Sequence, residues 1–190
     1  MAKRKNNKKK QRAKKASFSL KKWWSEEARE RKSILLFWFG FAGIMLLYYI
    51  IAIQPFFVEN IQEPVGAVFA YFGSGLLSLM GQRTVADGAA INSSDFSLLV
   101  KKGCDAIAPV MLVVTGISLF PTEWNKKLKG IGIGVLALFA LNLLRIVSLY
   151  FVGVHAPDYF EFMHVEFWQV LFIGLAVLYF FYWLNWAAKE

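Results

Sequence analysis

Long uncharged runs alternate with short polar segments along this chain. The first run, Ile34–Ile53, holds 20 consecutive uncharged residues, about the length an α-helix needs to cross a hydrocarbon core of roughly 30 Å. Gly130–Val154 and Trp168–Trp186 also qualify, although the former contains one arginine, and Ala106–Phe120 is a shorter candidate. The pattern predicts an all-α integral membrane protein with about four transmembrane helices.

The apolar segment Pro64–Gly81 is rich in Gly and Ser and is compatible with either a span or a surface helix. Short basic loops face the cytoplasm, and the loop after Phe120 is basic. That loop falls inside only if residues 64–81 do not cross. We therefore expect an interfacial helix there, with residues 54–103 and roughly 155–166 outside.

Strand character marks the polar stretch that follows. Thr84–Ile91 contains an Asp87-Gly88 turn pair, and Phe96–Val100 is apolar and ends on a β-branched residue. Alternating strands around such a turn favour a hairpin. We expect a small extracytoplasmic β-hairpin that serves as a loop or as a lid.

A basic tail precedes the first run. Residues 1–33 contain fourteen Lys or Arg against three Glu, a net charge of +11. Beside a membrane helix such a tail is mainly a topology determinant, and it attracts anionic lipids at roughly 1 kcal/mol per charge. Nucleic-acid binding is disfavoured. We expect a partly disordered cytoplasmic tail over 1–33, with a short surface helix over 17–32.

No repeat or linker divides the remainder, so residues 34–190 are expected to form a single transmembrane domain. The first run is too long for a signal peptide and no A-x-A site follows Ile53, which indicates an uncleaved anchor. Cys104 is the single cysteine, so an intrachain disulfide is excluded. The predicted location is the cytoplasmic (inner) membrane, multi-pass.

Under this topology four polar side chains converge on the outer side. Cys104 lies where the second span begins, and His164 lies just before the fourth. Asn142 and Arg145 are three residues apart, so they share one face of the third span. At 1.5 Å per residue, Arg145 lies roughly 10 Å below the helix exit near Phe151. A shared cleft is geometrically available.

Each of these residues has a structural alternative. A lone Cys at a helix start is often inert, and His164 can bond to lipid headgroups. Arg145 within a span costs at least about 2.5 kcal/mol and is functional by default, although it can also reach toward the interface. Asn142 can pair with it or join two helices, and Asp105 is a good helix cap.

The chemistry that fits is nucleophilic. A thiolate of Cys104 would attack an amide carbonyl while His164 moves the proton to the leaving amine. Arg145 would stabilise the thiolate or the developing oxyanion. One Cys and one His cannot build a closed zinc site, and no nucleotide-binding glycine pattern is present, so no metal or cofactor is expected.

Three sequence blocks, GCDAI at 103–107, NLLRI at 142–146 and MHVEFW at 163–168, resemble the signature blocks of the exosortase/archaeosortase family. The FPTEWNKKLKG loop is similar to that of its shorter, exosortase H-like members. The similarity covers about residues 60–186. The chain departs at Asp105-Ala106, where many members have Ser-Gly or Asp-Gly, and at Trp168, where many members have a glycine after the histidine.

The resemblance implies a membrane-embedded cysteine protease or transpeptidase active at the outer face. Its substrates would be membrane-tethered exported proteins, cleaved at a C-terminal sorting signal and passed to a surface acceptor. The implied catalytic residues are Cys104, Arg145 and His164, with Asp105, Asn142 and Trp168 in support. Many members have additional spans, so an accessory membrane subunit is a further expected partner.

One alternative belongs to a different class. In a noncatalytic membrane assembly factor or transporter subunit, Arg145 and Asn142 would hold a helix interface and Cys104 would be silent. Transporters show repeated or broken helices, for which four spans leave little room. The enzyme is the favoured hypothesis.

Overall fold

The computed structural model describes residues 32–101 and 103–189. The chain divides into two compact units, residues 1–42 and 43–190. In the first unit the described residues belong to a helix, Lys32–Ala52, whose last turns are part of the second unit. The basic tail and the expected surface helix over 17–32 lie outside the described residues, apart from Lys32 and Ser33.

Within the described residues, three helical segments are long and apolar enough to cross a membrane: Lys32–Ala52, Trp124–His155 (α5) and Pro157–Lys189. The fourth expected span is the 13-residue helix α4, Ile107–Leu119. At 1.5 Å per residue it is roughly 20 Å long, short of a hydrocarbon core of about 30 Å. The helical membrane architecture is confirmed, and the count of four spans stays a prediction.

The last of these segments is not a uniform α-helix. It begins with a 3₁₀ turn, η2 (Pro157–Tyr159), passes through a π-helical stretch, η3 (Phe162–Phe167), and continues as α6 (Trp168–Lys189). A π-turn inserts an extra residue into the helical repeat, and such turns are frequent at functional sites. The irregular first third of the segment therefore lies between the end of α5 and the regular helix α6.

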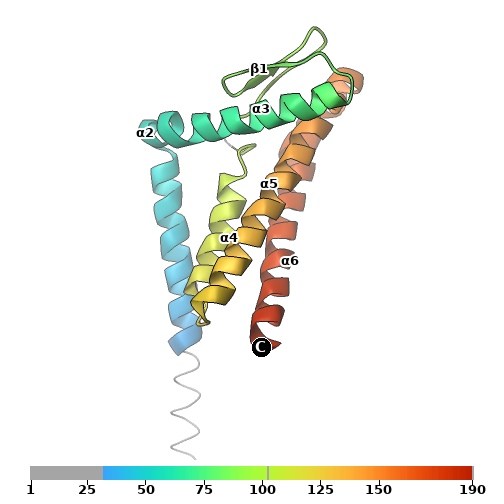
Figure 1. The fold of residues 1–190 in the computed structure, drawn as a ribbon. Helices are drawn as coiled ribbons and strands as arrows, with labels where there is room; N and C mark the ends of the chain where they lie inside the picture. Colours follow the sequence, from blue (N-terminus) through green and yellow to red (C-terminus); the bar gives the residue numbers. More distant parts are fainter. Residues whose placement is uncertain (1–31, 102, 190) are drawn as a thin grey trace, which may run out of the picture. The chain divides into compact units, whose positions relative to one another are not determined.

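A helical stretch of three parts precedes the sheet: α2 (Pro55–Phe57), a π-turn η1 (Val58–Gln62) and α3 (Glu63–Leu79). Figure 1 shows α3 running across α4, α5 and α6 instead of alongside them. Phe69 of α3 stacks on Phe139 of α5 at a ring-centroid distance of 4.8 Å. This direction is the one expected of a surface helix, and its position relative to a membrane stays a prediction.

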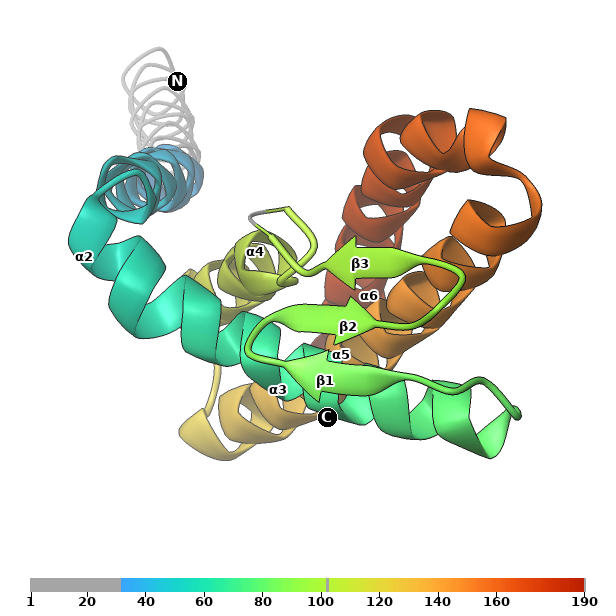
Figure 2. The same ribbon diagram turned by 90° about the horizontal axis from the view of Figure 1, so that it is seen from above.

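The polar stretch forms an antiparallel sheet of three strands: β1 (Val85–Asp87), β2 (Ala90–Asn92) and β3 (Ser97–Leu99) (Figure 2). A two-residue turn joins β1 to β2, with Gly88 at φ +55°, the left-handed conformation that tight hairpins require. The expected hairpin is thus present. The sheet also has a third strand that was not expected, because β3 pairs with β2 through Leu98 and Ile91.

Glycines in α3 bring the sheet and α5 into close contact. A Cβ on Gly73 would lie 3.1 Å from both Ile91 of β2 and Ile146 of α5, and one on Gly66 would lie 2.9 Å from the carbonyl oxygen of Val100. Larger residues at these positions would separate the layers. The resulting packing fixes where the chain leaves β3 and enters the loop that carries Cys104.

Candidate active site

The Cys104 loop is a tight turn between β3 and α4. The Cys104 amide donates to the carbonyl of Lys101 at 2.8 Å. Gly103 at φ +92° and Ala106 at φ +54° are both left-handed, a conformation that costs a non-glycine residue roughly 1–2 kcal/mol. Asp105 was expected to cap this helix; the N-cap is instead Ala106, and Asp105, one residue earlier, accepts a hydrogen bond from the Ile107 amide at 3.1 Å through its Oδ1.

His164 reaches this loop from the far end of the chain. Its Nδ1 lies 3.2 Å from Cys104 Sγ, within hydrogen-bond distance for sulfur, and its Nε2 lies 3.9 Å away. The histidine is half-buried on the π-turn η3, whereas Cys104 is only 3% exposed. The two residues that sequence analysis paired are therefore in contact.

Arg145 joins the two segments that carry this pair. Its Nη1 donates to the carbonyl of Gly103 at 2.7 Å and its Nη2 to the carbonyl of His164 at 2.8 Å. The guanidinium also lies over the ring of Phe172, 5.7 Å from its centroid. Both terminal nitrogens thus bind backbone oxygens next to the reacting groups, and the charge stands beside the thiol without a hydrogen bond to it.

Asn142 holds the loop one turn earlier on the same face of α5. Its Nδ2 donates to the carbonyl of Cys104 at 2.7 Å, and its side chain is fully buried. A loop carbonyl in an apolar interior costs free energy unless it is hydrogen-bonded. Asn142 and Arg145 supply donors to two successive carbonyls, which explains why polar residues are tolerated within an apolar helix.

Trp168 begins α6 and is 5% exposed. It packs against Phe172, with ring centroids 6.3 Å apart, and so lies behind the ring that supports Arg145. Within the described residues, three buried polar atoms of this region have no hydrogen-bond partner: Asn142 Oδ1, Arg145 Nε and Trp168 Nε1. Trp168 is thus linked to Arg145 only through Phe172 among the contacts described.

The electrostatics of the loop favour a neutral thiol. Burial raises the pKa of Cys104, the nearby charge of Arg145 lowers it, and the carboxylate of Asp105 raises it further, with a net increase. At neutral pH the thiol is then protonated and donates its S–H to Nδ1 of His164. In that arrangement Nδ1 accepts the hydrogen bond, so the single N–H of the neutral imidazole lies on Nε2.

Sequence analysis missed one contact of the site. The ring of Phe160 stacks on the imidazole of His164, with centroids 5.7 Å apart and an interplanar angle of 14°. The available signal was the spacing of four residues on one helix, which brings two side chains together. His155, by contrast, ends α5 and stacks on Phe151.

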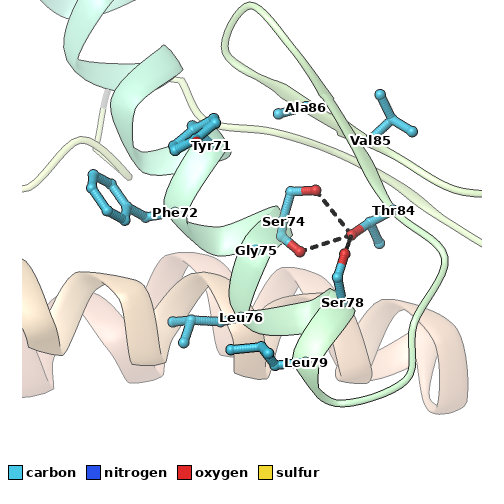
Figure 3. Close-up of a pocket in the computed structure, with 10 residues that line it drawn as sticks. All are labelled: Tyr71, Phe72, Ser74, Gly75, Leu76, Ser78, Leu79, Thr84, Val85 and Ala86. Carbon is cyan, nitrogen blue, oxygen red and sulfur yellow. Dashed lines mark hydrogen bonds between the residues drawn. The ribbon is translucent and has the colours of Figure 1, made fainter.

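Among the described residues, no group of three or more His, Cys, Asp or Glu could hold a metal ion. A separate hollow lies between α3 and β1 (Figure 3). Its hydroxyl groups bind one another, with Ser74 Oγ 3.0 Å and Ser78 Oγ 3.5 Å from Thr84 Oγ1. The side chains lining it include neither Cys104 nor His164, so it is not where the Cys–His pair acts.

Comparison with known proteins identifies the family. The family model for transmembrane exosortases matches residues 28–182, a range that includes Cys104, Asn142, Arg145 and His164. No curated protein and no solved structure was found to match the chain. The family resemblance expected from the three sequence blocks is confirmed.

Proposed function

The chain belongs to the transmembrane exosortase family, and from this premise we propose that it is a membrane-embedded cysteine protease or transpeptidase. Its substrates are exported proteins tethered by a C-terminal sorting signal, cleaved at the outer face of the cytoplasmic membrane. The observation that carries the proposal is the 3.2 Å contact between Cys104 Sγ and His164 Nδ1, a nucleophile and a base within proton-transfer distance.

In the first half-reaction the Cys104 S–H proton passes to His164 Nδ1 as Sγ bonds to the scissile carbonyl carbon. The tetrahedral intermediate then collapses, the C–N bond breaks and His164 returns the proton to the leaving amine. In the second half-reaction an acceptor amine or water attacks the thioester, gives its proton to His164 and displaces the thiol, which regains that proton. Every proton is returned, so the enzyme is regenerated.

Arg145 contributes in two ways under this proposal. Its hydrogen bonds to the carbonyls of Gly103 and His164 hold nucleophile and base in register. Its positive charge, close to Cys104 in a low-dielectric setting, offsets the negative charge that develops on sulfur and on the carbonyl oxygen. Lysine would keep the charge but could not bind two divergent carbonyls through one planar group.

The test is substrate processing in cells. Cys104→Ala should abolish cleavage of sorting-signal proteins while membrane insertion and expression stay normal, since an alanine fits the same space. His164→Ala should do the same, whereas His155→Ala, the matched control at the other histidine, should process normally. Equal processing by wild type and Cys104→Ala would contradict the proposal.

The noncatalytic alternative is favoured by one observation: Asn142 and Arg145 are committed to backbone carbonyls of their own chain, as purely structural residues would be. A membrane assembly factor of this kind should lose expression or assembly on Arg145→Ala and be unaffected by Cys104→Ala. The same set of variants therefore separates the two functions.

A further inference from the structure

Two contacts hold His164, one at its backbone and one on the face of its ring. Arg145 Nη2 fixes the backbone carbonyl of His164 at 2.8 Å, and the face of the ring stacks on Phe160 at 14°. Rotation of the imidazole about the Cβ–Cγ bond would change the distance of each ring nitrogen from Cys104 Sγ. These two distances already differ, at 3.2 Å for Nδ1 and 3.9 Å for Nε2. The orientation of the ring therefore decides whether the pair is formed.

Phe160 is itself supported by the extramembrane sheet. Phe96, in the connection between β2 and β3, contacts Phe160 with centroids 5.4 Å apart and contacts Tyr150 at 6.3 Å. The ring of Phe96 sits directly over Gly153 of α5, where any Cβ would overlap it. The position therefore requires glycine for the Phe96 ring to pack against α5.

The connection that presents Phe96 is fixed by a network around one hydroxyl. Ser93 Oγ accepts from the amides of Asp95 and Phe96 at 3.2 and 3.1 Å, and from the hydroxyl of Tyr150 at 2.9 Å. It also donates to the carbonyl of Phe96 at 2.9 Å. The sheet is thus joined to α5 at the point where Phe96 projects toward the His164 segment.

We propose that Phe160 is a positioning residue, which orients the His164 imidazole toward Cys104 and is held in place by Phe96 seated over Gly153. The three-stranded sheet is then part of the machinery that aligns the general base, and not only a cover for the site. This inference rests on the proposed function, since it concerns the base of that reaction. The contact it describes is measurable without any substrate.

The chain offers a clean spectroscopic test, because it contains two histidines and one cysteine. Full-length protein carrying ¹⁵N-labelled histidine, in detergent micelles, gives ring nitrogen shifts that report which nitrogen carries the hydrogen. Replacing the Cys104 thiol by Cys104→Ala should shift the Nδ1 signal of His164, and the size of that shift measures the contact. Two charged residues, Arg145 and Glu161, neighbour His164, and both are present in every variant.

In a Phe160→Leu background the shift caused by Cys104→Ala should be largely lost, because a tilted imidazole no longer faces the thiol. Phe160→Tyr keeps the aromatic face and should preserve the shift. Phe151→Leu is the matched control: it removes the same type of stack from His155 and should change only that signal. Phe96→Leu should reduce the His164 shift partially.

An undiminished shift in Phe160→Leu would overturn the inference, as would equal losses in Phe160→Leu and Phe160→Tyr. If Phe160→Leu does not fold, shown by loss of the His155 signal of the native state, Phe96→Leu decides the matter in its place, and an unchanged shift there overturns it. Failure of the proposed function would look different. Cys104→Ala would then leave substrate processing intact even though the Cys–His contact is observed.

Discussion

Cys104 is the residue whose surroundings are most unusual for its proposed role. A catalytic thiol is often activated by a lowered pKa, whereas the pKa of this one is raised, mainly by burial. In the proposed reaction, the thiol would therefore lose its proton only as it attacks the substrate, so that catalysis would depend strongly on proton transfer to His164.

Asp105→Asn should lower the pKa of Cys104, because Asp105 is one of the groups that raise it and the amide keeps an oxygen for the Ile107 amide. The pH at which the rate of iodoacetamide alkylation is half-maximal should move down. As the only cysteine, Cys104 can be followed by mass spectrometry in the full chain. Asp87→Asn, remote on the sheet, is the control, and a midpoint that moves upward contradicts the explanation.

At the residue scale, the sequence predicted that Cys104, Asn142, Arg145 and His164 lie close together, and the structure brings their side chains to one loop. The sequence was not sufficient to identify the partners. The acceptors of Asn142 and Arg145 are backbone carbonyls, which every residue possesses and no residue type reveals.

At the scale of elements, glycines and lysines determine how α5 meets its neighbours. Lys127 Nζ donates to the carbonyl of Ser118 near the end of α4, and Lys126 Nζ to the carbonyl of Ala187 near the end of α6. Carbonyls at helix C-termini lack intrahelical donors and are stabilised by cations. The lysines of the basic loop, which predicted the orientation of the chain, therefore also donate hydrogen bonds to carbonyls at the C-terminal ends of α4 and α6.

Gly130 and Gly132 form a matched pair on α5. A Cβ on Gly130 would overlap the indole of Trp183, which is 2% exposed, whereas nothing lies within 4 Å of one on Gly132. Gly130→Ala should lower the free energy of unfolding by about 1–3 kcal/mol through overpacking. Gly132→Ala should be neutral or stabilising by up to about 1 kcal/mol, since alanine is the better helix former.

Thermal unfolding of the two variants in the same detergent measures this difference. If Gly130→Ala were as stable as Gly132→Ala, the tight contact between α5 and α6 would not exist in solution. The short helix α4 was predictable from hydropathy, since Ala106–Phe120 was expected and Ile107–Leu119 is observed. The π-turn at His164 was not predictable, because it depends on how the chain packs between neighbouring elements and not on local composition.

For the whole molecule, the sheet and the basic loop before α5 are predicted to lie on opposite sides of the membrane. The proposed orientation puts the sheet outside, because short basic loops remain in the cytoplasm. Cys104 is a poor reporter of this, since at 3% exposure it would resist a bulky reagent from either side. Exposed positions at the sheet and at the loop are better ones.

In a Cys104→Ser background, Asp87→Cys should react with a membrane-impermeant maleimide in spheroplasts. Asn125→Cys, exposed at the start of α5, should react only after permeabilisation. The reverse labelling pattern, with Asn125→Cys reacting in spheroplasts and Asp87→Cys only after permeabilisation, would indicate the opposite orientation. Labelling of both sites in sealed cells would place residues 87 and 125 on one side, and would contradict an odd number of crossings between them.

The near-complete burial of Cys104 also bears on oxidation. The chain has no second cysteine, so a sulfenic acid formed on Cys104 has no thiol within the chain to reduce it by disulfide exchange, and further oxidation is irreversible. A protonated thiol that is 3% exposed reacts slowly with peroxides, because the thiolate is the species they attack. The same burial that raises the pKa of Cys104 therefore also slows the oxidation of the chain's only thiol.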